Sequence, residues 1–430
     1  MPSKNRVHQM LTRLFHNLRN KETETHRWFS TLSTTTLFSG TAAVLSLIAG
    51  VLISRTLPLE DVGRYGLLIS LIQILPILGA LGQPALMKRE YSLNPPGYFD
   101  WHQDVKNSLL FEIPSLIIVI AGSVWVYRLS PMQAGFIASA VLLTAVLHTV
   151  FEIMNAHRIY VWANLLLRIP NAMTLLPALL AFFFAGFARL DFILSILLIA
   201  LLGSLLLGLY LLEHTASRGT YHLPHRKRWL GLSLMVLAVT HFVPLQGLTA
   251  LGGLVVSLEE LAALTALGVL FRPFNLLREV ITQMMTVEIA RNRNLNRRKA
   301  AIWLWLLGGA LGGTAITTLP FIVPLLYGNR YDRYLSMILP LALTGAMVIT
   351  EIMPRSFITA RVKGHLIKKF GGCQTAIAVL CTGMAVIFGQ HAGISGLVWA
   401  GTLTLFLRNL CAYGFYFLAA RTGQVLPASR

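Results

Sequence analysis

The sequence predicts an all-α polytopic membrane protein with about twelve transmembrane helices. Only 12% of the 430 residues are charged and 55% are hydrophobic, whereas about 25% of the residues of a soluble protein are charged. The apolar residues also occur in long runs, close to the roughly 20 residues that a helix needs to cross the hydrocarbon core. Little sequence remains outside these runs, so we expect no separate soluble domain.

Twelve apolar runs are expected to cross the membrane, each as a helix. The fifth run is long and contains Arg168 and two prolines, so we expect it to be kinked or to start at the interface. The expected spans are 31–54, 66–87, 108–127, 133–154, 159–186, 192–212, 230–256, 261–286, 301–327, 334–356, 372–389 and 394–419.

The distribution of Lys and Arg predicts the orientation. With the N-terminus inside, 25 of the 36 Lys and Arg residues lie in cytoplasmic segments, 6 lie on the opposite side and 5 lie within spans. Cytoplasmic loops are enriched in positive charge, so both termini are predicted to be cytoplasmic. The same rule accounts for the net charge of +19 without a nucleic-acid partner.

The first 30 residues are polar and basic and lack the short apolar core of a cleavable signal peptide. Apolar residues recur at helical spacing from Val7 to Leu18, with Arg13 and Arg19 on the other side. This pattern is typical of an amphipathic helix on the membrane surface. A partly disordered basic tail is the alternative.

A faint repeat divides the chain into halves. The turn LEDVG at 59–63 follows the first span, and LEELA at 258–262 follows the seventh. Six spans per half give both halves the same orientation, as in transporters built from parallel repeats with the substrate site between them. The predicted segments are 1–30 (cytoplasmic basic amphipathic segment), 31–212 (N-terminal six-helix lobe), 213–229 (cytoplasmic basic linker), 230–420 (C-terminal six-helix lobe) and 421–430 (cytoplasmic tail).

Five arginines lie inside the apolar spans, namely Arg168, Arg272, Arg278, Arg355 and Arg408. An arginine there costs roughly 2.5–3.5 kcal/mol on insertion scales, and such residues usually face a water-filled cavity or a partner. Guanidinium groups grip phosphate through parallel hydrogen bonds, so Arg168, Arg272 and Arg278 are candidates to hold a diphosphate or an acidic sugar. Pairing within the protein is the alternative, and Glu279 lies two helical turns from Arg272.

Glu351 and Arg355 are four residues apart in the tenth span and are expected to form an ion pair. Arg355 can also snorkel to the interface. Both are candidates to line a substrate path, as is the polar Gln246 in the seventh span. Arg408 has no acidic residue within four positions, so the sequence assigns it no partner.

His148 and Glu152 are four residues apart near the inner end of the fourth span. Such a pair can relay protons. A satisfied polar contact between helices is the plainer alternative.

No motif indicates an enzyme, a cofactor or a metal site. A Gly-rich phosphate loop is absent, and no acidic cluster suggests a divalent cation. Cys373, Cys381 and Cys411 lack metal-ligand spacing and are expected to be packing residues. Energy for any transport is therefore expected from a gradient or from a partner.

Several short motifs resemble those of one family, in order and spacing along residues 31–420. The stretch RTLPLEDVGRYG at 55–66 is similar to the family's turn after its first helix, and LGVLFRPFNLL at 267–277 with TVEIAR at 286–291 is similar to its eighth helix. LYGNRY at 326–331 and GISGLVWA at 393–400 resemble two further helix boundaries. This family is the polysaccharide-transporter branch, with its O-antigen and oligosaccharide flippases, of the multidrug/oligosaccharidyl-lipid/polysaccharide exporter superfamily.

The resemblance implies two six-helix lobes around a central cavity that work by alternating access. It implies a flippase that moves undecaprenyl-diphosphate-linked oligosaccharide repeat units across the bacterial cytoplasmic (inner) membrane, for lipopolysaccharide or exopolysaccharide biosynthesis. The family's cavity-bordering helices favour Arg168, Arg272, Arg278, Glu351 and Arg355 over Arg408. A polysaccharide polymerase and glycosyltransferases are implied partners, and we expect the flippase itself to be a monomer.

Two other functions stay open. A cation-coupled exporter of small organic compounds needs acidic groups in its cavity, but the first and seventh spans contain none. Many members of the family carry an acidic residue in the seventh helix, where this chain has His241 and Gln246 as its strongly polar groups. A non-transporting scaffold for polysaccharide assembly is the third possibility.

Overall fold

The computed structural model is helical apart from turns and one isolated bridge in the residues that it describes, which confirms the predicted fold class. These residues are 24–93, 98–157, 159–216, 219–224, 228, 231–232, 235, 246–291, 297–362 and 364–422. Most of the predicted amphipathic segment lies outside them, and so does the stretch 236–245 of the predicted seventh span.

Helices follow one another through both halves of the chain. The first half contains α2 (Glu24–Thr56), α3 (Leu59–Gly79), α4 (Gln83–Leu93), α5 (Trp101–Tyr127), α6 (Pro131–Ala156), α7 (Tyr160–Met173), α8 (Leu175–Phe183), the short 3-10 helix η1 (Ala185–Phe187) and α9 (Leu190–Thr215). The second half contains α12 (Leu248–Val255), α13 (Leu258–Leu270), α14 (Arg272–Arg291), α15 (Arg297–Tyr327), the 3-10 segment η3 (Gly328–Met337), α16 (Ile338–Thr350), α17 (Ile352–Arg361) and α18 (Gly364–Thr422).

Seven helical ranges of the described chain are long and apolar enough to cross a membrane, or eight when the bent pair α13 and α14 counts as one span. Two of the ranges, Arg298–Ile358 and His365–Thr422, contain 61 and 58 residues. A straight helix of that length measures about 90 Å, about three times the hydrocarbon thickness. Each of these two ranges therefore accommodates two of the predicted spans.

The long helix α18 is a hairpin that turns at Ala392 and Gly393. Gly393 has a φ of 58°, a left-handed conformation that glycine adopts without steric cost. On either side of the turn, the Sγ atoms of Cys373 and Cys411 lie 3.0 Å apart, and the rings of Phe370 and Phe415 have centroids 5.5 Å apart. These pairs are symmetric about the turn, so the two arms of α18 run antiparallel.

Two spans are broken near their middle. The predicted fifth span is split at Thr174 into α7 and α8, in agreement with the kink that its prolines led us to expect. The eighth span bends by 49° between α13 and α14. Pro273 is the second residue of α14, and its missing N–H removes a helix hydrogen bond at the bend.

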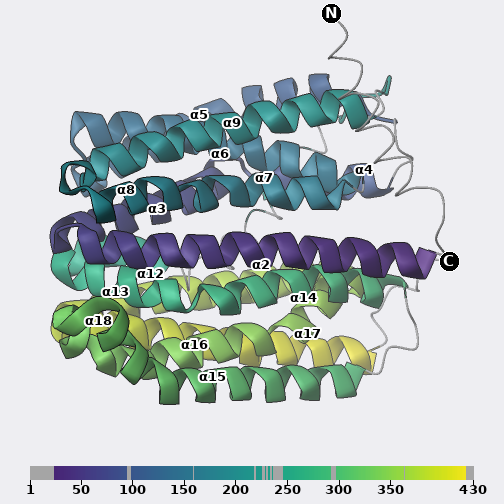
Figure 1. Cartoon of the computed structure of the whole chain (residues 1–430). Coiled ribbons are helices and arrows are strands. Elements are labelled where there is room, and N and C mark those ends of the chain that lie inside the picture. Colours follow the sequence, from purple (N-terminus) through teal and green to yellow (C-terminus); the bar gives the residue numbers. More distant parts are fainter. Residues whose placement is uncertain are drawn as a thin grey trace, which may run out of the picture.

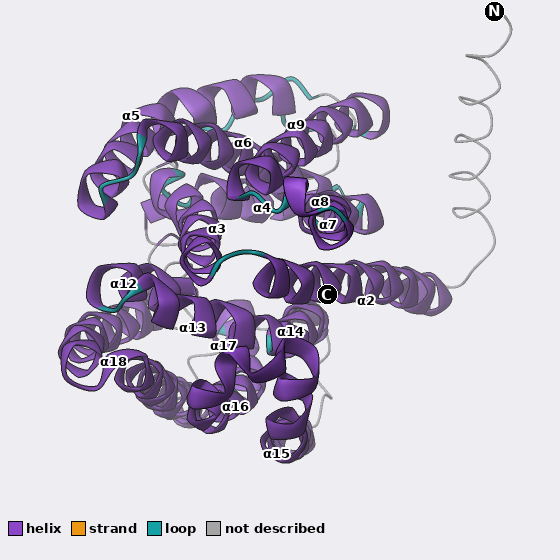
Figure 2. Ribbon diagram, turned by 60° about the vertical axis from the view of Figure 1, so that its left-hand side comes forward, coloured by secondary structure: helices purple, strands orange, loops and turns teal. Residues whose placement is uncertain are grey.

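The helices form two groups, with α2 between them (Figures 1 and 2). One group contains α3 to α9, and the other contains α12 to α18. The α2–α3 turn and the start of α13 lie at the same end of the bundle, on the left of Figure 1. Following the predicted orientation, we call this the outer end and the opposite one the inner end.

The two copies of the sequence repeat meet at the outer end. Helices α3 and α13 pack along each other, and a Cβ at Gly63 would lie 2.1 Å from the carbonyl oxygen of Leu258. Ser257 and Glu260 form a capping box that begins α13, so the acidic turn has a helix-starting role. Glycine at position 63 therefore sets the close approach of the two groups.

Candidate substrate-binding site

Four charged side chains, Arg278, Glu351, Arg355 and Arg408, come together among α14, α16, α17 and α18, and we call them the arginine cluster. A carboxylate oxygen of Glu351 lies 3.1 Å from Nη2 of Arg408 and 3.5 Å from Nη1 of Arg355. Arg278 also interacts electrostatically with Glu351. The predicted ion pair between Glu351 and Arg355 is confirmed, and Arg408 has the partner that the sequence did not reveal.

Gln374 holds Arg408 in place from the opposite arm of the α18 hairpin. Its amide oxygen accepts a hydrogen bond from Nε of Arg408 at 2.8 Å, and its amide nitrogen donates to the Arg408 carbonyl oxygen at 3.2 Å. Because the amide oxygen and the amide nitrogen of Gln374 both bond to Arg408, they hold its guanidinium beside Glu351. Its Nη1 has no hydrogen-bond partner among the described residues.

The arginine cluster is buried and carries excess positive charge. Arg408, Glu351 and Arg278 are 1%, 3% and 5% exposed. Three guanidinium groups face one carboxylate, so the formal charge is +2. Gathering like charges in a low-dielectric interior is costly. An anionic ligand would relieve this cost, and guanidinium groups suit phosphate oxygens in particular.

The arginine cluster lies in the inner half of the bundle. At 1.5 Å per residue, Glu351 is about 20 Å from the start of α16, and Arg408 is about 22 Å from the α18 turn. The hydrocarbon core is about 30 Å thick. The cluster is therefore closer to the predicted cytoplasmic face than to the outer face.

Arg272 lies between the two helix groups, on the outer side of the cluster. Its Nη1 donates to the Ser46 carbonyl oxygen of α2 at 3.1 Å and also to the Ser46 hydroxyl. Ser46 is about 15 Å from the Thr56 end of α2, so the contact lies near mid-membrane. Arg278, one and a half turns further along α14, is about 9 Å nearer the inner end.

Beyond Arg272, hydrogen bonds close the outer end. Arg330 in η3 donates to the carbonyl oxygens of Ser54, Arg55 and Leu57 at 3.0, 3.1 and 2.6 Å. The hydroxyl of Tyr331 donates to the Ser54 carbonyl oxygen at 3.1 Å. The last carbonyls of a helix lack partners within it, so η3 caps α2 and ties the C-terminal half to it.

The other predicted site residues lie apart from the arginine cluster. Arg168 is half-buried in α7, which packs on α2, α6 and α9. Gln246 is half-buried just before α12. Their roles in binding stay predictions, and the side chain of Glu279 lies outside what the structure describes.

Glu152, the candidate partner of His148 in a proton relay, forms its ion pair with Lys88. The Glu152 carboxylate lies 3.1 Å from Nζ of Lys88 in α4 and accepts a hydrogen bond from the amide of Asn155 at 3.2 Å. His148 is half-buried on the same helix. The structure therefore explains Glu152 by an ion pair between helices, while the relay itself stays a prediction.

A second buried group of charges, which the sequence did not reveal, lies at the inner end of the N-terminal half. We call Gln83, Tyr91, Asp104, Glu112 and Arg228 the aspartate cluster. The side chains of Arg228 and Asp104 are 0% exposed, with Nη2 of Arg228 3.7 Å from Oδ1 of Asp104. Arg228 belongs to the predicted cytoplasmic linker and counted there as a topology signal, but it is fully buried.

Each oxygen of the Asp104 carboxylate accepts a hydrogen bond. It accepts from the Leu223 backbone N–H at 2.9 Å and from the Tyr91 hydroxyl at 3.0 Å. Burial, and then the neighbouring Asp104 carboxylate, raise the pKa of Tyr91, so this hydroxyl stays a donor. Arg228 and Gln83 exchange hydrogen bonds at 3.0 and 3.3 Å. Glu112 accepts from Ser108 at 2.6 Å. These contacts fasten the linker to α4 and α5.

Within the described residues, no group of three or more His, Cys, Asp or Glu is placed to hold a metal ion.

No protein-family model matches the chain, and no curated protein matches it by sequence. Solved structures match over most of its length. The lipid II flippase MurJ in an inward closed conformation has 14% identity and a TM-score of 0.63, covering 90% of this chain and 87% of MurJ.

Two further solved structures have similar scores. One is a transporter of the MOP superfamily from Pyrococcus furiosus, described as having a binding pocket of reversed polarity, with 14% identity and a TM-score of 0.62 over 92% of this chain and 95% of that one. The other is an inward-facing multidrug-resistance MATE transporter, with 13% identity and a TM-score of 0.60 over 89% and 96%. The chain is thus a multi-pass membrane protein with the fold of these transporters.

Proposed function

We propose that this protein is a flippase for lipid-linked oligosaccharides whose linkage is a diphosphate, moved across the bacterial cytoplasmic membrane by alternating access. The observation that carries the proposal is the arginine cluster, a buried site with a formal charge of +2 in the inner half of the bundle. The likeness of fold to the lipid II flippase MurJ supports the same reaction class.

In this proposal, Arg278 and Arg355 hold the diphosphate, while Glu351 and Gln374 orient Arg408 behind them. Arg355 is the most exposed arginine of the cluster, since its side chain is 19% exposed and that of Arg408 is 1% exposed. The oligosaccharide extends toward the inner end, and the prenyl tail stays in lipid. Arg272 and Arg330 keep the outer end closed in this state.

Flipping requires that the loaded site favour a different conformation from the empty one. The diphosphate neutralises the excess charge of the arginine cluster, which removes repulsion among its guanidinium groups. We propose that this relief lets α14 shift and releases the contact of Arg272 with Ser46 at the same time. The outer end then opens because fewer hydrogen bonds hold it.

A cation-coupled exporter is less well supported by the site. The carboxylates of Asp104, Glu112 and Glu351 are each engaged by arginine or serine. An organic cation would have to displace one of these partners and approach the remaining positive charge. We therefore favour an anionic substrate.

The test is complementation of a bacterial strain that lacks its own flippase. We expect Arg278→Gln and Arg355→Gln each to lower surface-polysaccharide output by tenfold or more, with unchanged protein level, since each removes a charged hydrogen-bond donor worth about 1.5–3 kcal/mol. Arg64→Gln is the matched control, because Arg64 is 43% exposed and pairs with Glu60 and Asp61 at the outer end. Full output from both cluster variants would refute the role of the cluster.

A further inference from the structure

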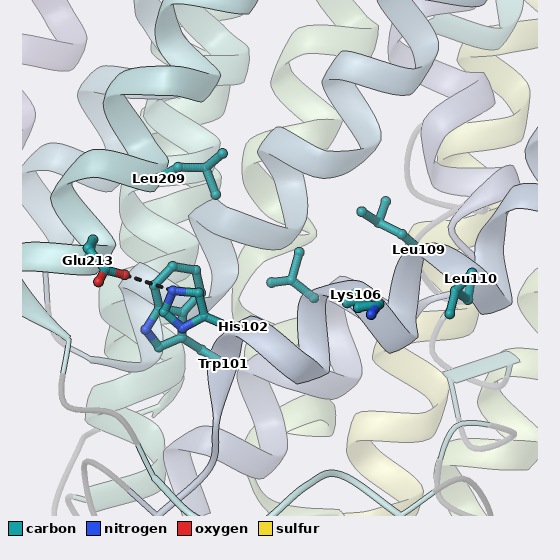
Figure 3. A pocket seen from close by; sticks show the side chains of 8 residues that line it. Trp101, His102, Lys106, Leu109, Leu110, Leu209 and Glu213 are labelled. Atoms are coloured by element: carbon teal, nitrogen blue, oxygen red, sulfur yellow. Dashed lines mark ion pairs between the residues drawn. The ribbon is translucent and has the colours of Figure 1, made fainter.

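A groove of about 470 Å³ lies on the side of the N-terminal half, between the inner ends of α5 and α9 (Figure 3). Val105, Leu109, Leu110 and Leu209 form its apolar wall. Charged side chains stand on both sides of it, with Glu213 from α9 at one side and Lys106 from α5 at the other. The groove is separate from both charge clusters and from the contact between the two helix groups.

The groove opens toward the bilayer. Helix α5 is the least enclosed of the spans: 17% of its apolar window is buried, against 67% for α3. Beyond the groove its exposed face continues through Leu110, Ile117 and Ile118, which are 62%, 60% and 71% exposed. A hydrocarbon chain in the groove would therefore run on along an apolar, lipid-facing surface.

The polar groups of the groove lie where a lipid headgroup would be. Asp100 caps the start of α5 by accepting from the His102 backbone N–H at 3.1 Å, so this is the inner boundary of the span. Lys106 is exposed one turn further on. Long cationic side chains at such depth carry their ammonium group toward the interface.

Two opposite charges frame the headgroup position. Nε2 of His102 lies 2.7 Å from the Glu213 carboxylate, and Glu213 is still 41% exposed. The Glu213 carboxylate therefore still presents exposed surface to the groove. Lys106 offers an ammonium on the other side of the groove (Figure 3). The groove therefore has an ammonium group on one side and a carboxylate on the other.

A hydrogen-bond donor without a partner among the described residues lies in the wall of the groove, on the Glu213 side (Figure 3). The side chain of Trp101 is 3% exposed and lines the groove, stacked on the His102 ring at 3.6 Å between centroids. Its indole nitrogen has no hydrogen-bond partner among the residues that the structure describes. A buried donor without a partner costs about 1–3 kcal/mol, and a phosphate or ester oxygen would satisfy it.

We propose that this groove binds an inner-leaflet phospholipid whose headgroup carries a primary ammonium. One acyl chain lies along Leu109, Leu110 and Leu209, and the phosphate accepts from Lys106 and from the Trp101 indole. The ammonium donates to Glu213. A headgroup with only negative charge would meet the Glu213 carboxylate, and a quaternary ammonium has no N–H to donate, so both fit less well.

The test uses the full chain purified in detergent and exposed to equal amounts of phosphatidylethanolamine, phosphatidylcholine and phosphatidylglycerol, with retained lipids counted by native mass spectrometry. We expect the ethanolamine lipid to be retained about fivefold over each of the others. Lys106→Gln and Glu213→Gln should each lower its retention about two- to fivefold, as for partly exposed ion pairs. Leu209→Trp, which fills the groove, should lower it at least tenfold.

Matched controls are Lys368→Gln at the start of α18 and Asp191→Asn at the outer end of α9, which should leave retention unchanged. Excess retention of phosphatidylglycerol, or no preference among the three lipids, would overturn the proposal. Displacement of the ethanolamine lipid by undecaprenyl diphosphate would also overturn it, because the groove would then belong to the transported substrate. The lipid site does not depend on the proposed function, and loss of polysaccharide output in arginine-cluster variants leaves its test unaffected.

Discussion

The two buried charge clusters are built from the same groups but are balanced differently. In the aspartate cluster one arginine faces Asp104 and Glu112, and neighbouring backbone and side-chain groups use both oxygens of Asp104. In the arginine cluster three arginines share the single carboxylate of Glu351. The first has no positive charge left over, whereas the second has a formal charge of +2.

This difference separates a structural role from a binding role. Buried charges persist when their partners satisfy them, and removing one partner of such a pair costs about 3–5 kcal/mol. The aspartate cluster pairs its charges inside the protein and holds the linker to the N-terminal half, although Nε and Nη2 of Arg228 and one oxygen of Glu112 have no hydrogen-bond partner among the described residues. In the arginine cluster three arginines gather around one carboxylate, and we propose that an external anion joins them.

The largest expected effect is on stability, from Asp104→Asn. The change removes the charge that faces Arg228 and disturbs the hydrogen bonds from Tyr91 and Leu223, so we expect unfolding to become easier by about 3–5 kcal/mol. The measurement is the Tm of the detergent-purified protein. A combined Asp104→Leu and Arg228→Met variant should recover part of the loss, since it buries no unpaired charge. An unchanged Tm for Asp104→Asn would erase the distinction between the clusters.

Glu351→Gln should destabilise the arginine cluster in a different way. The three guanidinium groups lose their counter-charge, and we expect a loss of about 3 kcal/mol. Pyrophosphate at 100 times its dissociation constant should restore about 2.7 kcal/mol, seen as a rise in Tm. The same addition should not rescue Asp104→Asn. Rescue of both variants, or of neither, would contradict the comparison.

Arg330→Gln should change how often the outer end opens, and should leave the charge of both clusters unaltered. It removes the hydrogen bonds to three carbonyl groups at the end of α2, and we expect the outer end to open about ten- to a hundredfold more often, equivalent to about 1.4–2.8 kcal/mol. A cysteine at Thr265, in the contact of α13 with Gly66, should then react faster with a membrane-impermeant maleimide added outside. A cysteine at Ser108, beside Glu112, should stay unreactive, because the aspartate cluster does not take part in opening.

Lys88→Gln is expected to have the smallest effect on stability, and it serves as the reference for the variants of both clusters. Lys88 is 47% exposed where it meets Glu152, and exposed ion pairs contribute less than about 1 kcal/mol. We expect the Tm to change little and polysaccharide output to stay normal. If Lys88→Gln lowered the Tm as much as Asp104→Asn, exposure would not distinguish the Lys88–Glu152 pair from the Asp104–Arg228 pair.

Local patterns in the sequence predicted much of the fold. The apolar runs, the kink in the fifth span and the helix start at the acidic turn of α13 each depend on neighbouring residues, and the structure agrees with them. The ion pair of Glu351 and Arg355 was predictable because an i,i+4 spacing fixes the geometry within one helix.

Contacts between distant segments were beyond the reach of the sequence. Arg408 and Glu351 are 57 positions apart and meet only because the α18 hairpin packs against α16 and α17. Arg272 and Ser46 are 226 positions apart. Arg228 looked like a loop charge because its neighbours Arg226 and Lys227 are basic too. In the structure, residues 219–223 bond to residues 98–104 at the start of α5 and Arg228 is buried beside Asp104, contacts that no local pattern signals.

The spacing of the ion pairs has a consequence for synthesis of the protein. Arg408 follows Glu351 by 57 positions, and Arg228 follows Asp104 by 124. At about 5–20 residues per second, each acid exists for roughly 3–11 and 6–25 seconds before this arginine is made. In both pairs the acid is made first and the arginine last. A carboxyl group can enter lipid in its protonated form, whereas a guanidinium stays charged. The ribosome thus delivers Glu351, which can wait in the bilayer without charge, before Arg408, which cannot.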